Sequence, residues 1–344
     1  MEEAHANWPK DPLGYGYYRH FTSSSWNGDS EYSTIDTSLF YVGCEFAGKY
    51  FGGEVKTLAD TIFQSINFQK SIENDGGSAV YACVGECSAA DADITGMGGR
   101  FISPFNEYVI LSALAMKWEK MFTQEIYATN YYDTYFGIEG KPVGANNKPV
   151  TVNYNGFEVL SDHGSFVASF IPQFAWYTLK DWRSNHFNVQ MMENWLLAEK
   201  SYWSDCGGRY NSMTTWGKNV TGRVYGSAAG DCPNNAYCVL DVGGTKSGKD
   251  TWSAAVMGGF IGAVSGNLRD QVNDDINWLY ENEVCTYTKT TNTGVSSTVL
   301  WRCSVDIDNS DWVADRPTGV DFATMIFGYA TNFLPENFFD TYAV

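Results

Sequence analysis

Apolar residues along this chain recur mainly at steps of three and four, which is the spacing that places side chains on one face of an α-helix. Residues 29–53 show the pattern most clearly. The apolar stripe there consists of Ile35, Leu39, Val42, Phe46 and Tyr50. Ser33 and Asp36 have the spacing of a capping box at the start of this segment, and Gly52 with Gly53 ends it. The pattern predicts a core helix.

The helical spacing continues in the segments that follow. Residues 55–69 predict a second helix, antiparallel to the first. Residues 98–120 predict another, with Ser103 as its cap and Pro104 in its first turn. Further helices are expected at residues 161–182, 188–203, 252–264, 268–283 and 322–333.

Strand patterns are scarce by comparison, and a short pair near residues 79–83 is one of the few. About nine to twelve helices of ordinary length predict a mainly α fold with a few short strands in loops. No linker or shift in composition divides the chain, so we expect a single domain over residues 1–344. Successive helical hairpins of this kind suit an α/α toroid.

The charge of the chain limits its partners. The formal net charge is −18, because the chain has 40 Asp and Glu residues but 22 Lys and Arg residues. Nucleic acids and anionic membrane surfaces need clustered Lys and Arg, so neither is expected to bind. A neutral ligand suits the composition better, and we expect a monomer. No apolar run has the length of a membrane span and no signal-peptide pattern precedes Trp8, so the chain as given is expected to be soluble.

The chain has eight cysteines. Their even number and close spacing predict at least two disulfides and an oxidising compartment, so we expect a secreted or periplasmic protein. The closest neighbours in sequence are Cys83 with Cys87, Cys232 with Cys238 and Cys285 with Cys303, and the first and third of these are the preferred pairs. No C-x-x-C pair occurs and the four histidines are scattered, so we expect neither a metal site nor a cofactor.

Several motifs resemble one known family. GYGYYRHF at residues 14–21, followed by STIDTSLFYVGCEFAGKYF at residues 33–51, resembles the opening of glycoamylase-like domains. These domains occur in β-1,2-glucan-cleaving glycoside hydrolases and in the cyclisation domain of cyclic β-1,2-glucan synthases. Residues 98–115 resemble the family's Gly-aromatic-x-x-x-x-Asn-Glu helix, and residues 319–321 stand where the family has Gly-Ile-Asp. The resemblance implies an (α/α)6 barrel, which the number of predicted helices permits.

The resemblance also implies catalytic residues. Glu107 matches the family's general acid, which protonates the glycosidic oxygen. Asp36 is the first candidate for the base, with Glu31 and Asp321 behind it. From local pattern alone, each of these is a charge near a helix start, where Asp and Glu stabilise the helix dipole. The two interpretations differ in their consequence, because a capping residue supports stability and a catalytic carboxylate supports turnover.

Residues of the kinds that stack on pyranose rings or clamp them complete the expected site. The predicted substrate-binding residues are Tyr18, His20, Trp26, Arg100, Trp176 and Asp321. In the helix that carries Trp176, Pro172 stands where the family has a His. The leading hypothesis is an endo-acting, inverting β-1,2-glucan hydrolase with an oligo- or polysaccharide substrate. A retaining transglycosylase of the cyclic-glucan kind and a non-catalytic glucan-binding barrel stay open.

Overall fold

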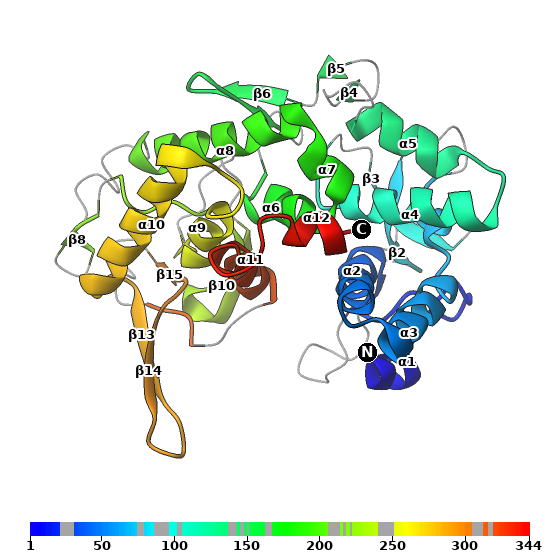
Figure 1. Cartoon of the computed structure of the whole chain (residues 1–344), viewed down its shortest axis with the longest axis horizontal. Helices are drawn as coiled ribbons and strands as arrows, with labels where there is room; N and C mark the ends of the chain where they lie inside the picture. Colours follow the sequence, from blue (N-terminus) through cyan, green and yellow to red (C-terminus); the bar gives the residue numbers. More distant parts are fainter. Residues whose placement is uncertain are drawn as a thin grey trace. The chain divides into compact units, whose positions relative to one another are not determined.

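A computed structural model (Figure 1) describes residues 1–20, 31–73, 79–85, 96–101, 105–136, 143–144, 148–149, 151–161, 167–205, 214–215, 218–220, 222–239, 251–304, 312–315 and 319–344. The chain forms two compact units. Unit 1 comprises Met1–Val150, Tyr177–Arg183 and Asn337–Val344, and unit 2 comprises Thr151–Trp176 and Ser184–Glu336. Each unit draws on separate stretches of chain, and the single domain expected over residues 1–344 stays a prediction.

Helices supply most of the secondary structure of unit 1. They are α1 (Glu2–Asn7), α2 (Thr34–Phe51), α3 (Gly53–Gln64), the 3-10 helix η2 (Phe68–Ser71), α4 (Tyr108–Phe122), α5 (Tyr127–Phe136), α7 (Lys180–Ser184, whose last residue belongs to unit 2) and α12 (Phe338–Tyr342). The strands are β1 (Tyr32–Ser33), β2 (Val80–Val84), β3 (Met97–Phe101), β4 (Val143–Gly144) and β5 (Lys148–Pro149).

The predicted antiparallel helix pair is present as α2 and α3. Gly52 joins the two helices at φ +67°, a left-handed conformation that glycine adopts without a steric penalty. A Cβ placed on Gly48 would lie 3.0 Å from the Cβ of Ala59, and the rings of Tyr41 and Phe63 stack with their centroids 4.8 Å apart. Because the later residue of α2 meets the earlier residue of α3, the helices run in opposite directions. This prediction is confirmed.

The buried face of α2 is rotated from the predicted apolar stripe. Tyr50 is 52% exposed, whereas Glu45 is buried. Burial of that carboxylate is tolerated because Lys117 Nζ of α4 lies 2.8 Å from Glu45 Oε1 and Lys49 Nζ lies 3.4 Å from it. The prediction that Tyr50 is a core residue was wrong. The spacing of apolar residues could not show that Glu45 is buried instead, with its charge compensated by Lys117 and Lys49.

A three-stranded antiparallel sheet, in the order β1-β2-β3, packs beside the start of α2. Ser33 of β1 lies opposite Cys83 of β2, and Tyr81 of β2 lies opposite Arg100 of β3. The short strand pair expected near residues 79–83 is therefore confirmed. Residues 98–101, which precede the predicted helix cap at Ser103, pair with β2 as a strand that was not expected, and α4 begins only at Tyr108. Residues 103 and 104, the predicted cap and first turn, lie outside the described residues.

Unit 2 combines helices with two-stranded antiparallel pairs. Its helices are α6 (Phe170–Thr178, which runs on into unit 1), α8 (His186–Asp205), the 3-10 helix η4 (Pro233–Asn235), α9 (Ala254–Phe260), α10 (Gly266–Glu281) and α11 (Gly319–Ala330). The paired strands are β6 (Thr151–Tyr154) with β7 (Phe157–Leu160), β8 (Thr214–Thr215) with β9 (Lys218–Asn219), β10 (Ala229–Cys232) with β11 (Ala236–Val239), β12 (Thr251–Trp252) with β15 (Cys303–Ser304), and β13 (Thr286–Thr290) with β14 (Ser296–Leu300).

Helices α9 and α11 of unit 2 approach one another through glycines. A Cβ placed on Gly328 would lie 1.8 Å from the carbonyl oxygen of Gly258 and 3.1 Å from the Cα of Gly259. No side chain fits between the two backbones there. The close contact therefore depends on glycine at position 328, in a segment that the sequence predicted only as an apolar helix.

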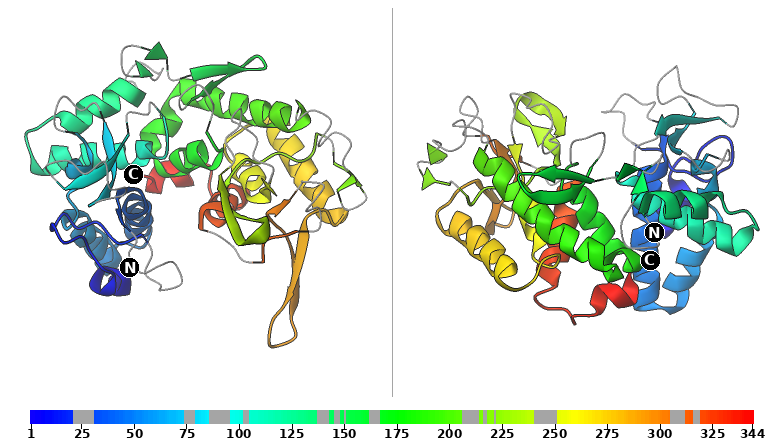
Figure 2. Two further views of the ribbon diagram at one scale, coloured as in Figure 1. Left: turned by 180° about the vertical axis from the view of Figure 1, so that it is seen from behind. Right: turned by 90° about the horizontal axis from the view of Figure 1, so that it is seen from above.

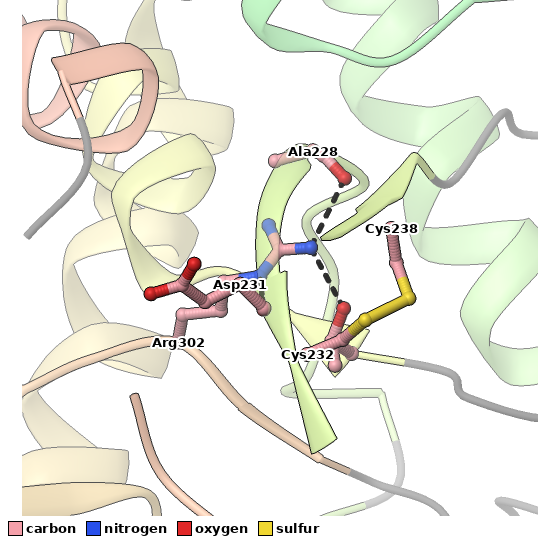
Figure 3. Close-up of a disulfide and its surroundings, with 6 residues drawn as sticks. Ala228, Asp231, Cys232, Cys238 and Arg302 are labelled. Atoms are coloured by element: carbon pink, nitrogen blue, oxygen red, sulfur yellow. Dashed lines mark hydrogen bonds between the residues drawn. A yellow bond between two sulfur atoms is a disulfide. The ribbon is translucent and has the colours of Figure 1, made fainter. Parts of the chain in front are cut away.

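One disulfide of unit 2 closes the β10–β11 hairpin, where Cys232 is bonded to Cys238 (Figure 3). Beside it, the guanidinium of the buried Arg302 donates from Nε to the carbonyl oxygen of Asp231 at 2.7 Å and from Nη2 to that of Ala228 at 3.3 Å. The disulfide closes the hairpin, and the arginine holds it against the short segment between β14 and β15.

A second disulfide joins Cys285 to Cys303 at the base of the β13–β14 hairpin, which projects from unit 2 as an arm (Figure 1, Figure 2). The prediction of at least two bridges and the pairing of Cys285 with Cys303 are therefore confirmed. Cys83 is also disulfide-bonded, but its predicted partner Cys87 lies outside the described residues. Cys44 is free and buried.

The mainly α class with a few short strands is confirmed by these elements. The barrel arrangement of the helices stays a prediction. In the part of the chain that the structure describes, no helix combines the length and the apolar character needed to cross a membrane.

Candidate active site

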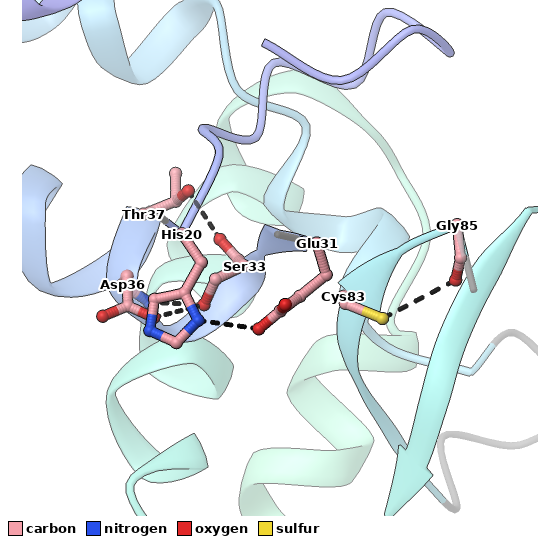
Figure 4. A network of polar contacts seen from close by, with 7 residues as sticks. All are labelled: His20, Glu31, Ser33, Asp36, Thr37, Cys83 and Gly85. Atoms are coloured by element: carbon pink, nitrogen blue, oxygen red, sulfur yellow. Dashed lines mark hydrogen bonds and ion pairs between the residues drawn. The ribbon is translucent and has the colours of Figure 1, made fainter. Parts of the chain in front are cut away.

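A histidine lies between two carboxylates at the start of α2 in unit 1 (Figure 4). His20 Nδ1 is 2.7 Å from Glu31 Oε1, and His20 Nε2 is 3.3 Å from Asp36 Oδ2. The side chains of His20, Glu31 and Asp36 are 30%, 36% and 50% exposed. A dissolved ligand can therefore reach all three.

Backbone pairing brings these side chains together. The N–H of His20 donates to the carbonyl oxygen of Glu31 at 2.9 Å, and the N–H of Ser33 donates to that of Tyr18 at 3.0 Å. Residues 18–20 therefore run beside residues 31–33. The N–H of Tyr18 also donates to Thr37 Oγ1 at 2.9 Å, which fixes the segment against the first turn of α2.

Asp11 shapes the glycine-rich turn that leads into this pairing. Its carboxylate oxygens accept four backbone N–H bonds of 2.6 to 3.1 Å, from Leu13, Tyr15, Gly16 and Tyr17. Gly16 has φ +90°, and a Cβ there would lie 2.0 Å from the carbonyl oxygen of Ser65. The sequence analysis missed Asp11. The signal was an Asp before a Pro and two glycines, since Asp side chains commonly bond the backbone of such turns.

Asp36 is held mainly by side chains. Its N–H donates to Ser33 Oγ at 3.0 Å, and the Ser33 hydroxyl donates to Asp36 Oδ2 at 2.5 Å. The same Oδ2 faces His20. Residue 36 thus forms part of the α2 cap through its backbone, while its carboxylate points toward the imidazole.

Glu107 stands directly before α4. Its side chain makes no capping bond to that helix, and its N–H donates to Asn106 Oδ1 at 2.7 Å. Burial and, to a lesser extent, the Asp36 carboxylate raise the pKa of Glu107 to about 7, against an opposing effect of His20. Glu107 therefore holds its proton up to neutral pH, which an exposed first-turn glutamate does not do.

Glu107 and Asp36 supply the protonated acid and the ionised base that acid–base chemistry requires. Glu107 is a carboxyl that keeps its proton near neutrality, and Asp36 is an accessible carboxylate whose negative charge Glu107 senses. Among the described residues, no group of three or more His, Cys, Asp and Glu side chains is arranged to hold a metal ion.

Two of the predicted substrate-binding residues in unit 1 are engaged by neighbouring side chains. Tyr18 is buried, its hydroxyl lies 2.8 Å from His5 Nδ1, and burial raises the pKa of Tyr18 to about 12. Arg100 makes two hydrogen bonds to Glu73, from Nε at 2.8 Å and from Nη2 at 2.9 Å. Tyr18 thus supports the segment that carries His20, and Arg100 joins β3 to Glu73, two residues after the end of η2.

The remaining predicted substrate-binding residues are not among the described side chains of unit 1. Trp26 lies outside the described residues. Trp176 belongs to unit 2, where it is buried and its indole N–H donates to the carbonyl oxygen of Gly262 at 3.0 Å. Asp321 is in α11, and its side chain lies outside the described part of the structure. Unit 1 thus gathers His20, Glu31, Asp36 and Glu107, and the roles of the remaining residues stay predictions.

No known family model matches the chain, and no curated protein sequence is significantly similar to it. Solved structures do match. The chain shares its fold with β-1,2-glucanases. The endo-β-1,2-glucanase of Chitinophaga pinensis, solved with sophorotriose and glucose, matches over 98% of this chain and 75% of its own, with a TM-score of 0.61 and 13% identity.

Two further structures support the same fold. The β-1,2-glucanase of Parabacteroides distasonis matches over 98% of this chain at a TM-score of 0.62 and 16% identity, and the chain spans 48% of that protein. A protein of Bacteroides uniformis, provisionally described as a glucoamylase, matches over 97% of this chain and 76% of its own, at a TM-score of 0.63 and 12% identity. The predicted resemblance to glycoamylase-like, β-1,2-glucan-active domains is confirmed at the level of the fold.

Proposed function

We propose that the chain is a glycoside hydrolase that cleaves β-1,2-glucan, with Glu107 as its general acid. The observation that carries the proposal is the position of Glu107, which stands directly before α4 without capping it through its side chain and whose pKa burial and the Asp36 carboxylate raise to about 7. Hydrolysis of a glycosidic bond needs a protonated carboxyl at the leaving oxygen and a second, ionised carboxylate. The fold shared with β-1,2-glucanases supports the choice of substrate.

In this proposal Glu107 gives its proton to the glycosidic oxygen, and Asp36 takes a proton from water that attacks the anomeric carbon from the other face. The product is inverted, and cleavage is endo-acting. Asp36 is preferred as base because it is the carboxylate that acts on Glu107 and half of its side chain is exposed. Glu31 is engaged at 2.7 Å by His20, and Asp321 remains a further candidate.

The proposal extends to architecture and location. The helical hairpins and the structural matches support an (α/α)6 barrel that acts as one catalytic domain. The bridges Cys232–Cys238 and Cys285–Cys303 support an oxidising compartment, so we place the protein outside the cytoplasm, as a monomer. A neutral polysaccharide agrees with the formal charge of −18.

The test is incubation with linear β-1,2-, β-1,3- and β-1,4-glucans, with chromatography of the products and NMR detection of the first anomer released. We expect β-1,2-linked oligosaccharides from the first substrate alone, with α-anomeric reducing ends. β-Anomeric products would instead indicate a covalent intermediate and a transglycosylase. Binding without cleavage would indicate a glucan-binding barrel, and neither binding nor cleavage would reject the proposal.

A further inference from the structure

The imidazole of His20 contacts both neighbouring carboxylates through its two different nitrogens. Nδ1 is 2.7 Å from Glu31 Oε1, and Nε2 is 3.3 Å from Asp36 Oδ2 (Figure 4). The shorter contact favours a proton on Nδ1 that is donated to Glu31. In the neutral ring this leaves the Nε2 lone pair directed at Asp36, and in the charged ring both nitrogens donate.

Turnover by the proposed route leaves two groups in the wrong protonation state. When the bond between the anomeric carbon and the glycosidic oxygen breaks, Glu107 has given its proton to the leaving oxygen. When the new bond from water to the anomeric carbon forms, Asp36 holds the proton that water lost. Before the next cycle, one proton must leave Asp36 and one must reach Glu107.

We propose that His20 stores this proton between turnovers: its Nε2 takes the proton from Asp36, and the ring then returns it to Glu107 through solvent water. This inference rests on the proposed hydrolase function. The proton on Asp36 passes to Nε2, which gives an imidazolium between the Glu31 and Asp36 carboxylates. The imidazolium then gives a proton to ionised Glu107, and all three residues regain their starting states. Each cycle consumes only the water added across the bond.

The charged groups around His20 support this role. Among the described residues, Glu31 and Asp36 contact the ring directly, and Glu107 at the start of α4 is close enough for His20 to influence its pKa. Glu31 and Asp36 place acceptor oxygens beside both ring nitrogens, so an imidazolium can donate a hydrogen bond through each nitrogen where it forms. Glu31 acts as a positioning residue, because its contact with Nδ1 leaves Nε2 as the atom that faces Asp36.

The test compares the variants His20→Gln and His186→Gln. Glutamine keeps hydrogen-bonding capacity at position 20 but cannot carry a proton at neutral pH, so it separates proton storage from positioning. His186 is an exposed histidine at the start of α8 in unit 2 with no role in the proposed mechanism, and it serves as the matched control. For each protein, kcat and KM on linear β-1,2-glucan are measured from pH 4 to pH 9, with thermal unfolding as the check on folding.

We expect His20→Gln to fold normally and to lose about 100-fold in kcat with little change in KM, the range typical of one acid–base group. The acid limb of its kcat profile should move to lower pH, because protonation of the imidazole no longer blocks transfer from Asp36. Added imidazole should restore part of kcat in His20→Ala. His186→Gln should match the wild type throughout.

Three outcomes would overturn the inference, and they can be told apart. An active wild type whose His20→Gln variant keeps its kcat and its acid limb would reject the proton store and leave the hydrolase proposal standing. A wild type that cleaves none of the glucans would reject both together. If His20→Gln fails to fold, the response of His20→Ala to imidazole decides, and the absence of any rescue rejects the proton store.

Discussion

The backbone N–H of Ser33 donates to the carbonyl oxygen of Tyr18 at 3.0 Å, although the spacing of Ser33 and Asp36 is that of a capping box. In a complete box, the carboxylate of residue 36 would accept that N–H. Here the first half of the box is present, since the N–H of Asp36 donates to Ser33 Oγ. The second half is absent, because the N–H of Ser33 is used in the pairing of residues 18–20 with residues 31–33. The Asp36 carboxylate contacts His20 instead.

Asp36→Asn should therefore abolish turnover with little loss of stability. The N–H of residue 36 still donates to Ser33 Oγ in the variant, so most of the cap survives. We expect kcat on β-1,2-glucan to fall by about 10²- to 10⁴-fold, while glucan binding by calorimetry is retained. Glu31→Gln is the comparison, and its fall should be smaller. If Glu31→Gln is instead the inactive variant, Glu31 is the base, and if neither loses activity the base is elsewhere.

Glu107→Gln should abolish turnover and change the pH dependence of stability. The pKa of Glu107 is raised in the folded state from 4.5 to about 7, so its contribution to stability is complete below pH 4.5 and is lost as the pH rises through 7. Glutamine is uncharged at every pH. The variant should therefore gain about 1–3 kcal/mol in unfolding free energy relative to the wild type between pH 4.5 and pH 8, a range discounted for the part of Glu107 that solvent reaches.

Urea unfolding at pH 4.5, 6 and 8 measures this difference. Glu54→Gln is the control, because Glu54 is exposed in the first turn of α3. Its effect should stay within about 1 kcal/mol, the size of a helix-dipole interaction, and vary little over this range. A Glu107→Gln variant that tracks this control at all three pH values would mean that the carboxyl is not desolvated.

The sequence predicted helices well where packing follows apolar periodicity. The α2–α3 pair is an example, since its turn, its direction and its glycine junction were all expected. Periodicity failed where polar groups compensate one another, as at Glu45 with Lys117 and Lys49. It also missed structure that long-range pairing decides, because no strand was predicted at residues 98–101, which pair with β2.

The candidate active site was harder to predict from the sequence than the helices were. Asp36 and Glu107 are far apart in sequence, and neither hydrophobic spacing nor capping patterns place them near one another. The resemblance to glycoamylase-like domains supplied that link, and the pKa of Glu107 supports it. The contact of His20 with two carboxylates depends on the pairing of residues 18–20 with residues 31–33, for which the sequence has no periodic signal.

The Cys285–Cys303 bridge should stabilise the protein by constraining its unfolded state. The bridge spans a sequence separation of 18 and encloses the β13–β14 hairpin. We expect the double variant Cys285→Ser/Cys303→Ser to lose about 3 kcal/mol in unfolding free energy, as for a closed loop of similar length. Cys44→Ala is the control, since it removes a free buried thiol and opens no loop.

Thiol counting in denaturant without reductant should find at least the four cysteines of the two described bridges unreactive. Eight reactive thiols would contradict the bridges.

The contact between α9 and α11 gives the sharpest test of the fold of unit 2. In Gly328→Ala, the new Cβ would lie 1.8 Å from the carbonyl oxygen of Gly258, so the backbones of α9 and α11 would have to move apart. Alanine favours the helix by about 1 kcal/mol over glycine, but overpacking of a close contact typically costs about 1–3 kcal/mol and more where backbones must separate. We therefore expect a net loss of about 2 kcal/mol or more in urea unfolding.

Gly319→Ala is the matched control, because Gly319 is in the same helix and nothing lies within 4 Å of its Cβ position. The same change there removes conformational freedom from the unfolded chain without a clash, so it should be neutral or stabilise by up to about 1 kcal/mol. Gly328→Ala should thus be less stable than the wild type, and Gly319→Ala should not. Equal stabilities would mean that α9 and α11 do not meet at Gly258 and Gly328, and the arrangement of unit 2 around these helices would be wrong.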